Sequence, residues 1–237
     1  MKTDKSKIIV IEGPDGAGKT QLITDMRKYI NNCTEWHAKN LNFPYHKSFG
    51  YRKLREILSS DNNTIPSDIV QSLFILNMID TNENFINKIY CNSRDILFLD
   101  RSIISTIIYN TDGSILNMIT NHIRKKHNNI YYKVNFDIIS KEYMNLQNPV
   151  DHIYILLPPL NIILNNIENR SKSEDIDCND KSDKVKEHYK LYQMFYDGLT
   201  DEEKNTKFTL LDKWDDLLSI RDNYTNIRKA IIDDILP

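Results

Sequence analysis

Glycine is scarce in this sequence, which has six glycines among 237 residues. Three of them stand close together, at Gly13, Gly16 and Gly18. Glycine adopts left-handed and otherwise strained backbone conformations at little cost. Its concentration in one short stretch indicates a backbone with special demands at that point, and it leaves few tight glycine turns for the rest of the chain.

Cysteines are also few, and long apolar runs are absent. The three cysteines are odd in number and form no CxxC pair, which argues against a disulfide framework and against a zinc site. No stretch approaches the roughly 18 consecutive apolar residues of a membrane span, and the first residues contain no apolar signal-peptide core. We therefore expect reduced thiols, no membrane partner and a cytoplasmic location.

The chain has no excess of charge of either sign. It has 31 Lys and Arg residues against 33 Asp and Glu residues, which gives a formal net charge of −2 at pH 7. A strong basic field is the usual signature of nucleic-acid binding, so we expect no nucleic-acid partner. An anionic ligand would have to be held by local groups.

Short apolar segments alternate with stretches of helical periodicity. The predicted strands are 7–12, 33–43, 95–100, 152–157 and 208–212. The predicted helices are 21–30, 51–60, 67–90, 158–169, 183–197 and 214–235, with mostly helix and loop over 103–145. Such alternation predicts an α/β fold of three layers, α/β/α, around a parallel sheet of about five strands. Because no repeat or linker interrupts it, we expect residues 1–237 to form a single domain.

The glycine-rich stretch is a phosphate-loop sequence. Residues 13–20 read Gly-Pro-Asp-Gly-Ala-Gly-Lys-Thr, the GxxxxGK[ST] pattern, and lie between a predicted strand and a predicted helix. In such a loop backbone N–H groups surround phosphate oxygens, Lys19 reaches the β- and γ-phosphates, and Thr20 binds Mg²⁺. We therefore expect ATP and Mg²⁺ as cofactors. The predicted ATP-binding residues are Gly13, Asp15, Gly16, Ala17, Gly18, Lys19, Thr20 and Gln21.

A second constellation follows the strand 95–100, which ends in Asp100 and Arg101. In open α/β sheets ligands bind beyond the carboxyl ends of the strands, so this pair should face the same crevice as the phosphate loop. Asp100 is a second candidate ligand of Mg²⁺, and the guanidinium of Arg101 can hold an acceptor phosphate through two hydrogen bonds. The alternative is a plain salt bridge at a strand end.

With these motifs the chain resembles thymidylate kinase, within the nucleoside-monophosphate and deoxynucleoside kinase group. The matching stretches are Ile11 to Thr20, Phe43-Pro44 with Ser48 and Gly50, Leu73-Phe74-x-x-Asn77, Asp100-Arg101-x-x-x-Ser105-x-x-x-Tyr109, Leu156-x-Pro158-Pro159 with Arg170, and Leu210-Leu211-Asp212. The resemblance implies a P-loop NTPase fold with a lid segment, a homodimer, and transfer of the γ-phosphoryl group of ATP to dTMP.

The resemblance also implies roles for single residues. Asp15 would lie near the sugar of the acceptor, Phe74 would stack on its base, and Arg101 would hold its phosphate. Ser105 and Tyr109 would line the acceptor pocket. The predicted catalytic residues are Lys19, Arg101, Arg170 and Asp15; the predicted substrate-binding residues are Phe74, Asp100, Arg101, Ser105, Tyr109 and His46.

Several positions depart from the family pattern. Met78 and His46 stand where arginines are usual, which puts strict dTMP specificity in question. Gly16 replaces an arginine that some members carry in the loop, so the missing charge should come from the lid at about 170–182. Arg170 is the first candidate for that cation and Lys172 the second; the other interpretation is a solvated, charged loop.

Two other functions stay open on the sequence alone. A deoxynucleoside kinase would act on a neutral sugar hydroxyl and would need a carboxylate base, for which Glu12 and Asp100 are available. A catalytically degenerate nucleotide-binding protein would bind ATP without transferring phosphate. A panel of nucleosides and nucleoside monophosphates separates these possibilities.

Overall fold

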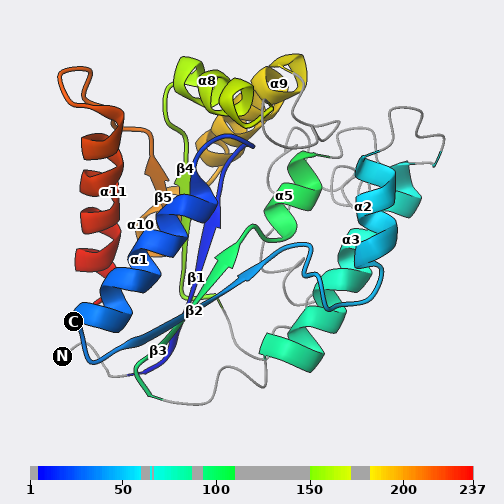
Figure 1. Cartoon of the computed structure of the whole chain (residues 1–237), viewed down its shortest axis with the longest axis horizontal. Helices are drawn as coiled ribbons and strands as arrows, with labels where there is room; N and C mark the ends of the chain where they lie inside the picture. Colours follow the sequence, from blue (N-terminus) through cyan, green and yellow to red (C-terminus); the bar gives the residue numbers. More distant parts are fainter. Residues whose placement is uncertain are drawn as a thin grey trace.

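A five-stranded parallel sheet forms the centre of the molecule (Figure 1). The computed structural model describes residues 5–59, 65, 67–86, 93–109, 150–171 and 182–236. The strands are β1 (Lys7–Glu12), β2 (His37–Asn42), β3 (Asp95–Asp100), β4 (His152–Leu156) and β5 (Phe208–Leu211). Their order in the sheet is β2-β3-β1-β4-β5, and every neighbouring pair is parallel. The predicted parallel sheet of five strands is confirmed.

Each strand contributes to two hydrophobic clusters, one on each face of the sheet. Successive side chains of a strand point to opposite faces, so Ile8 and Val10 of β1 enter one cluster while Ile9 and Ile11 enter the other. The buried, uninterrupted apolar sequence of β1 follows from this arrangement, because a parallel strand covered on both sides has no solvent face.

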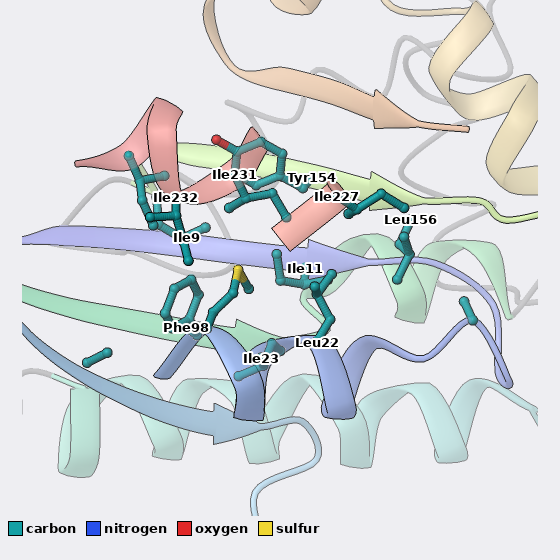
Figure 2. Close-up of a cluster of buried hydrophobic side chains, with 14 of the residues drawn as sticks. Ile9, Ile11, Leu22, Ile23, Phe98, Tyr154, Leu156, Ile227, Ile231 and Ile232 are labelled. Atoms are coloured by element: carbon teal, nitrogen blue, oxygen red, sulfur yellow. The ribbon is translucent and has the colours of Figure 1, made fainter. Parts of the chain in front are cut away.

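Helices cover both faces. α1 (Lys19–Cys33) and α11 (Ile220–Ile235) pack on the face that contains Ile9 and Ile11, as Figure 2 shows. The opposite cluster receives residues from α3 (Ser67–Thr81), α5 (Ile103–Ile108) and α9 (Ser182–Asp197). The remaining elements are α2 (Tyr51–Leu58), the π-helix η1 (Asn82–Ile86), α8 (Leu160–Ser171) and α10 (Asp201–Thr206). No helix within the described ranges is long and apolar enough to cross a membrane.

Local capping decides one helix start that the apolar pattern misplaced and one short helix that it missed. α11 begins at Ile220 rather than at 214, because Ser219 caps it by accepting a hydrogen bond from the amide of Asp222 at 3.1 Å. The preceding loop is held by Asn223, whose side chain accepts from the amide of Asp215 at 2.9 Å. The short helix α10 was not predicted; it starts with a capping box between Thr200 and Glu203.

Candidate active site

The turn between β1 and α1 uses backbone conformations that glycine adopts easily. Gly13 and Gly16 have positive φ angles of 140° and 79°. A Cβ atom at Gly13 would lie 2.4 Å from the carbonyl oxygen of Leu156, so the loop passes directly against the end of β4. The loop ends at the N-terminus of α1, where the helix dipole adds partial positive charge. This geometry suits an anionic ligand.

Lys19 is a buried cation at the start of α1. Its side chain lies inside the site, and Nζ donates to the carbonyl oxygen of Pro14 at 2.8 Å. Burial, reinforced by the charge of Arg101, lowers the pKa of Lys19 to about 8, although Asp15 and the other nearby carboxylates oppose the shift. An ammonium group has three donors, so donors remain for a phosphate.

Thr20 and Asp100 meet between α1 and the end of β3. The hydroxyl of Thr20 donates to Oδ2 of Asp100. Hydroxyl and carboxylate oxygens suit Mg²⁺, which usually completes its shell with waters and substrate phosphates. The donor set therefore fits the predicted metal. Across the described ranges no group of three or more His, Cys, Asp and Glu side chains could hold a metal by itself.

Arg101 follows β3 in a left-handed backbone conformation, with φ 77°. Its amide donates to the carbonyl oxygen of Ile11 at 3.1 Å, which ties the turn to β1. Its guanidinium donates to Asp15, to Ser105 at 3.0 Å and to the hydroxyl of Tyr109 at 3.0 Å. A non-glycine residue in such a backbone conformation costs about 1–3 kcal/mol. The hydrogen bonds of the amide and of the guanidinium offset this cost and fix the position of the side chain.

Asp15 is the carboxylate between the two cations. Burial alone would raise its pKa, but the charges of Arg101, Lys19 and Arg170 and a hydrogen bond from Tyr109 lower it to about 2. Asp15 therefore stays ionised at any physiological pH, and it is paired with the guanidinium of Arg101.

Glu12 lies behind these groups and is completely buried. Its carboxylate accepts hydrogen bonds from the amide and hydroxyl of Ser102, both at 2.6 Å, and from the hydroxyls of Ser105 at 2.7 Å and Tyr192 at 2.8 Å. These donors come from the turn after β3, from α5 and from α9. Glu12 is thus a structural carboxylate whose hydrogen-bonding capacity is taken up within the protein.

A comparison with known families identifies the family of the chain. The family model described as thymidylate kinase matches residues 11–212, a range that contains all the side chains described above. The chain belongs to the thymidylate kinase family. It is therefore a phosphotransferase that phosphorylates dTMP with ATP as the phosphate donor.

A solved structure of a thymidylate kinase has the same fold. The chain matches the enzyme from Candida albicans with a TM-score of 0.65 and 18% sequence identity, over 97% of this chain and 92% of that chain. The Candida enzyme is described as having broad substrate specificity and a novel structural element. This likeness shows the P-loop NTPase fold alone. No curated protein matches the sequence significantly.

The fold explains why this member of the thymidylate kinase family has Gly16 in place of an arginine. A Cβ atom at Gly16 would lie 2.7 Å from the carbonyl oxygen of Ile163 and 2.7 Å from a side-chain carbon of Ile167. Both residues belong to α8, which therefore packs directly on the loop. An arginine cannot occupy this position without moving α8, so the cation has to come from elsewhere.

A cavity of about 1350 Å³ joins most of the predicted site residues. It is lined by the loop and the first turn of α1, by Asp100 and Arg101, and by residues of α8 and α11. The predicted residues on its wall are Asp15, Gly16, Gly18, Lys19, Thr20, Gln21, Asp100, Arg101 and Arg170. Gly13 and Ala17 are buried beneath the loop surface.

Four predicted substrate-binding residues are not on the wall of this cavity. Ser105 is buried and binds Glu12 and Arg101, so it contacts the arginine rather than open space. Tyr109 lies beside Arg101. Phe74 is half-buried on α3, and His46 is exposed in the loop after β2. Their roles toward the acceptor stay predictions.

The departures at positions 46 and 78 have clear structural settings. Met78 is 3% exposed within a hydrophobic cluster, so it serves as a packing residue. The ring of His46 contacts the rings of Tyr45 and Tyr51 edge-on. Asn77, one residue before Met78, bonds the backbone of Tyr45 at 2.8 Å and 3.1 Å and thereby fixes the loop that carries His46.

Arg170 lies near the end of α8, on the wall of the cavity. Its charge is one cause of the lowered pKa of Asp15. Most of the predicted lid, residues 172–181 with Lys172, lies outside the described residues. Arg170 is thus the cation of that segment that the structure brings to the site.

Sequence motifs missed three polar side chains of the site: Asn166, Tyr192 and Tyr224. Tyr192 bonds Glu12, and the other two bond carbonyl groups of the phosphate loop. Each stands within a helix whose pattern predicts packing, at least 150 residues from its partner. No local signal marks such residues.

Proposed function

We propose that this chain transfers the γ-phosphoryl group of ATP to the phosphate of dTMP with Lys19 on the donor and Arg101 on the acceptor. One observation carries the assignment. Lys19 opens α1 after the loop that follows β1, and Arg101 follows the neighbouring strand β3. Both cations line one cavity and both act on the ionised Asp15, which is paired with Arg101. A phosphate loop and a separate anion-binding arginine in one space suit two phosphorylated substrates.

The transfer of phosphate to dTMP requires positioned substrates and nearby positive charge, and it requires no general base. The phosphate of dTMP is already an anionic nucleophile, so catalysis depends on in-line alignment and on cations around the transferring group. Lys19 supplies charge at the donor, Arg101 orients the acceptor, and Arg170 approaches from α8. Asp15, paired with Arg101, keeps the guanidinium directed into the cavity.

Mg²⁺ fits the pair of Thr20 and Asp100, which would hold it beside the first turn of α1. When bound there, the ion neutralises charge on the phosphate oxygens of the donor. Removal of the metal by a chelator should abolish phosphate transfer, whereas a variant such as Asp100→Asn should require more Mg²⁺ for half-maximal activity.

The positions of the carboxylates of Glu12 and Asp100 argue against a nucleoside 5′-hydroxyl as the acceptor. A base must reach the proton that it removes, but Glu12 is completely buried and bonded to four donor groups. Asp100 is bonded to Thr20. Neither is placed as a free base.

An acceptor panel tests the proposal. We expect ADP release with dTMP to exceed that with thymidine, and the panel should include other deoxynucleoside monophosphates because Met78 and His46 replace arginines. Faster turnover with thymidine would overturn the assignment. ATP binding without turnover of any acceptor would favour a degenerate protein.

A matched pair of arginine variants tests the acceptor site itself. Arg101→Ala should lower kcat/KM for dTMP about 10- to 100-fold, the effect of losing a charge-assisted hydrogen bond, with a smaller change in KM for ATP. Arg94→Ala is the control, because Arg94 also has a positive φ, 67°, and an ion pair, with Glu35. Equal effects of the two variants would remove the role of Arg101.

We further propose a cytoplasmic homodimer. α3 exposes Ile69, Leu76 and Ile79, which are 51%, 45% and 39% accessible and lie on one side of the helix. An apolar helix side of this kind is typical of an interface. Light scattering should give the mass of a dimer, and Leu76→Glu should give a monomer; a monomeric parent protein would refute this part.

A further inference from the structure

Two side chains on the wall of the cavity hold the phosphate loop by its carbonyl groups. Nδ2 of Asn166, on α8, donates to the carbonyl oxygen of Gly16 at 2.9 Å. The hydroxyl of Tyr224, on α11, donates to the carbonyl oxygen of Ala17 at 2.8 Å. Two consecutive carbonyl groups of the loop are therefore fixed by two different helices.

Fixing a carbonyl group also fixes the amide that follows it. The peptide group is planar and trans, so its N–H points opposite to its C=O. The bond to Gly16 therefore sets the direction of the amide of Ala17, which donates to the carbonyl oxygen of Pro14 at 3.3 Å and closes the turn. The bond to Ala17 sets the direction of the amide of Gly18. Inward-pointing amides of this loop are the groups that surround phosphate oxygens.

Tyr224 is itself held rigidly. Its ring packs edge-on against Trp214, with 5.4 Å between the centroids and 86° between the planes. A Cβ atom at Gly18 would lie 2.9 Å from its hydroxyl oxygen, so the tyrosine lies directly on the loop. Burial raises the pKa of Tyr224 to about 12, and its hydroxyl stays a neutral donor. The loop is therefore supported by a fixed group and not by a mobile surface side chain.

Asn166 also links the loop to the cation of α8. Arg170 follows Asn166 by one helical turn, and residues at this spacing lie on the same side of a helix. Both line the cavity. The hydrogen bond from Asn166 to Gly16 therefore sets the position of α8, and with it that of Arg170, relative to the phosphate loop.

From these contacts we propose that Asn166 and Tyr224 are positioning residues. Tyr224 orients the amide of Gly18 toward the donor's phosphates, and Asn166 fixes the turn before it together with the position of Arg170. The inference rests on the proposed use of this loop for ATP.

Single-atom and single-group variants test it. Tyr224→Phe removes only the hydroxyl, and Asn166→Ala removes only the carboxamide group. Each should raise KM for ATP about fivefold, the effect of one neutral hydrogen bond, with KM for dTMP unchanged. Asn166→Ala should in addition lower kcat, because it also frees Arg170.

Tyr154→Phe is the matched control. The hydroxyl of Tyr154 also donates to a residue of α11, Asp234, near the opposite end of that helix from the loop. This variant should lower the melting temperature and leave KM for ATP within twofold of the parent value. A melting-temperature loss in Tyr224→Phe without a rise in KM for ATP would overturn the proposal.

Direct binding separates this inference from the proposed function. If the parent protein phosphorylates no acceptor, the proposed function fails. Titration calorimetry with ATP alone still tests whether Asn166 and Tyr224 position the loop. A weaker affinity in Tyr224→Phe and Asn166→Ala than in Tyr154→Phe supports it. Equal affinities in all three variants refute it.

Discussion

The donor side and the acceptor side of the site are built in different ways. On the donor side, backbone amides, a helix N-terminus and the exposed residues Thr20 and Gln21 border an open cavity. On the acceptor side, Arg101 is bonded to Asp15, Ser105 and the hydroxyl of Tyr109. The donor side is organised by the chain's own backbone, and the acceptor side by side chains bonded to one another.

This difference has an electrostatic consequence. The acceptor arginine already has a carboxylate partner, so an incoming phosphate shares the guanidinium with Asp15. Within the part of the chain that the structure describes, Lys19 donates to the carbonyl oxygen of Pro14 at 2.8 Å, and the nearby carboxylates act on it through their charge without a direct bond. A polyphosphate at the loop therefore has no ion pair of Lys19 with a described residue to displace, whereas the acceptor competes with the ion pair of Arg101 and Asp15. Substitutions on the donor side and on the acceptor side should accordingly change different kinetic and stability parameters.

The largest effect is expected at Lys19. Lys19→Ala should lower kcat about 10²- to 10³-fold, the effect of removing one preorganised group that stabilises developing charge. The fold should stay intact, because no hydrophobic contact is lost in either cluster. ADP release and the melting temperature measure the two quantities. Lys28→Ala, an exposed position on the same helix, is the control; unchanged turnover in Lys19→Ala would remove its role.

Glu12 should show the opposite balance between stability and activity. Glu12→Gln replaces the charge that four donor groups share, so the free energy of unfolding should fall by about 1.5–3 kcal/mol. Arg101 should lose its position through Ser105, and kcat/KM for dTMP should fall more than kcat/KM for ATP. Denaturant unfolding and steady-state kinetics test this. Glu35→Gln, in an exposed ion pair, should change neither.

The same contrast explains how far the sequence could predict the site. The donor side could be predicted because its residues are contiguous: a strand, a glycine-rich turn and a helix stand next to one another in the chain. The acceptor side could be predicted only where it follows β3. Tyr192 reaches Glu12 across 180 positions of sequence, and only the three-dimensional fold brings them together.

The fold shows a similar division. Strands β1 and β3 were predictable because buried parallel strands are continuous apolar runs. β2 has a largely polar sequence, and it covers His37–Asn42 instead of the predicted 33–43. The start of α11 was not predictable, because Leu217 and Leu218 continue the apolar pattern while Ser219 and Asn223 impose a loop and a cap. Single polar hydrogen bonds decided that boundary, and periodicity does not report them.

The pH dependence offers a finer separation of the two sides. The pKa of Lys19 is lowered to about 8, so Lys19 loses its proton as the pH rises above that value. kcat/KM for ATP, which reports the free enzyme, should fall about tenfold per pH unit above about pH 8. Lys19→Arg should remove this descending limb, because arginine stays charged. If Lys19→Arg keeps the descending limb, the limb belongs to the titration of another group. The ¹³Cε chemical shift of Lys19, followed against pH, measures the pKa of Lys19 directly.

The smallest effect separates backbone strain from contact with α8. Gly16 and Gly50 have almost the same positive φ, 79° and 76°. A Cβ atom at Gly50 would meet its nearest neighbour, on Leu73, at an ordinary 3.5 Å, whereas at Gly16 it would lie 2.7 Å from a backbone oxygen of Ile163. Gly50→Ala should therefore cost only the left-handed strain of about 1–2 kcal/mol. Gly16→Ala should cost more, and should also raise KM for ATP because α8 is displaced. Equal losses of unfolding free energy in the two variants would show that α8 yields without penalty, and then an arginine could have been accommodated in this loop.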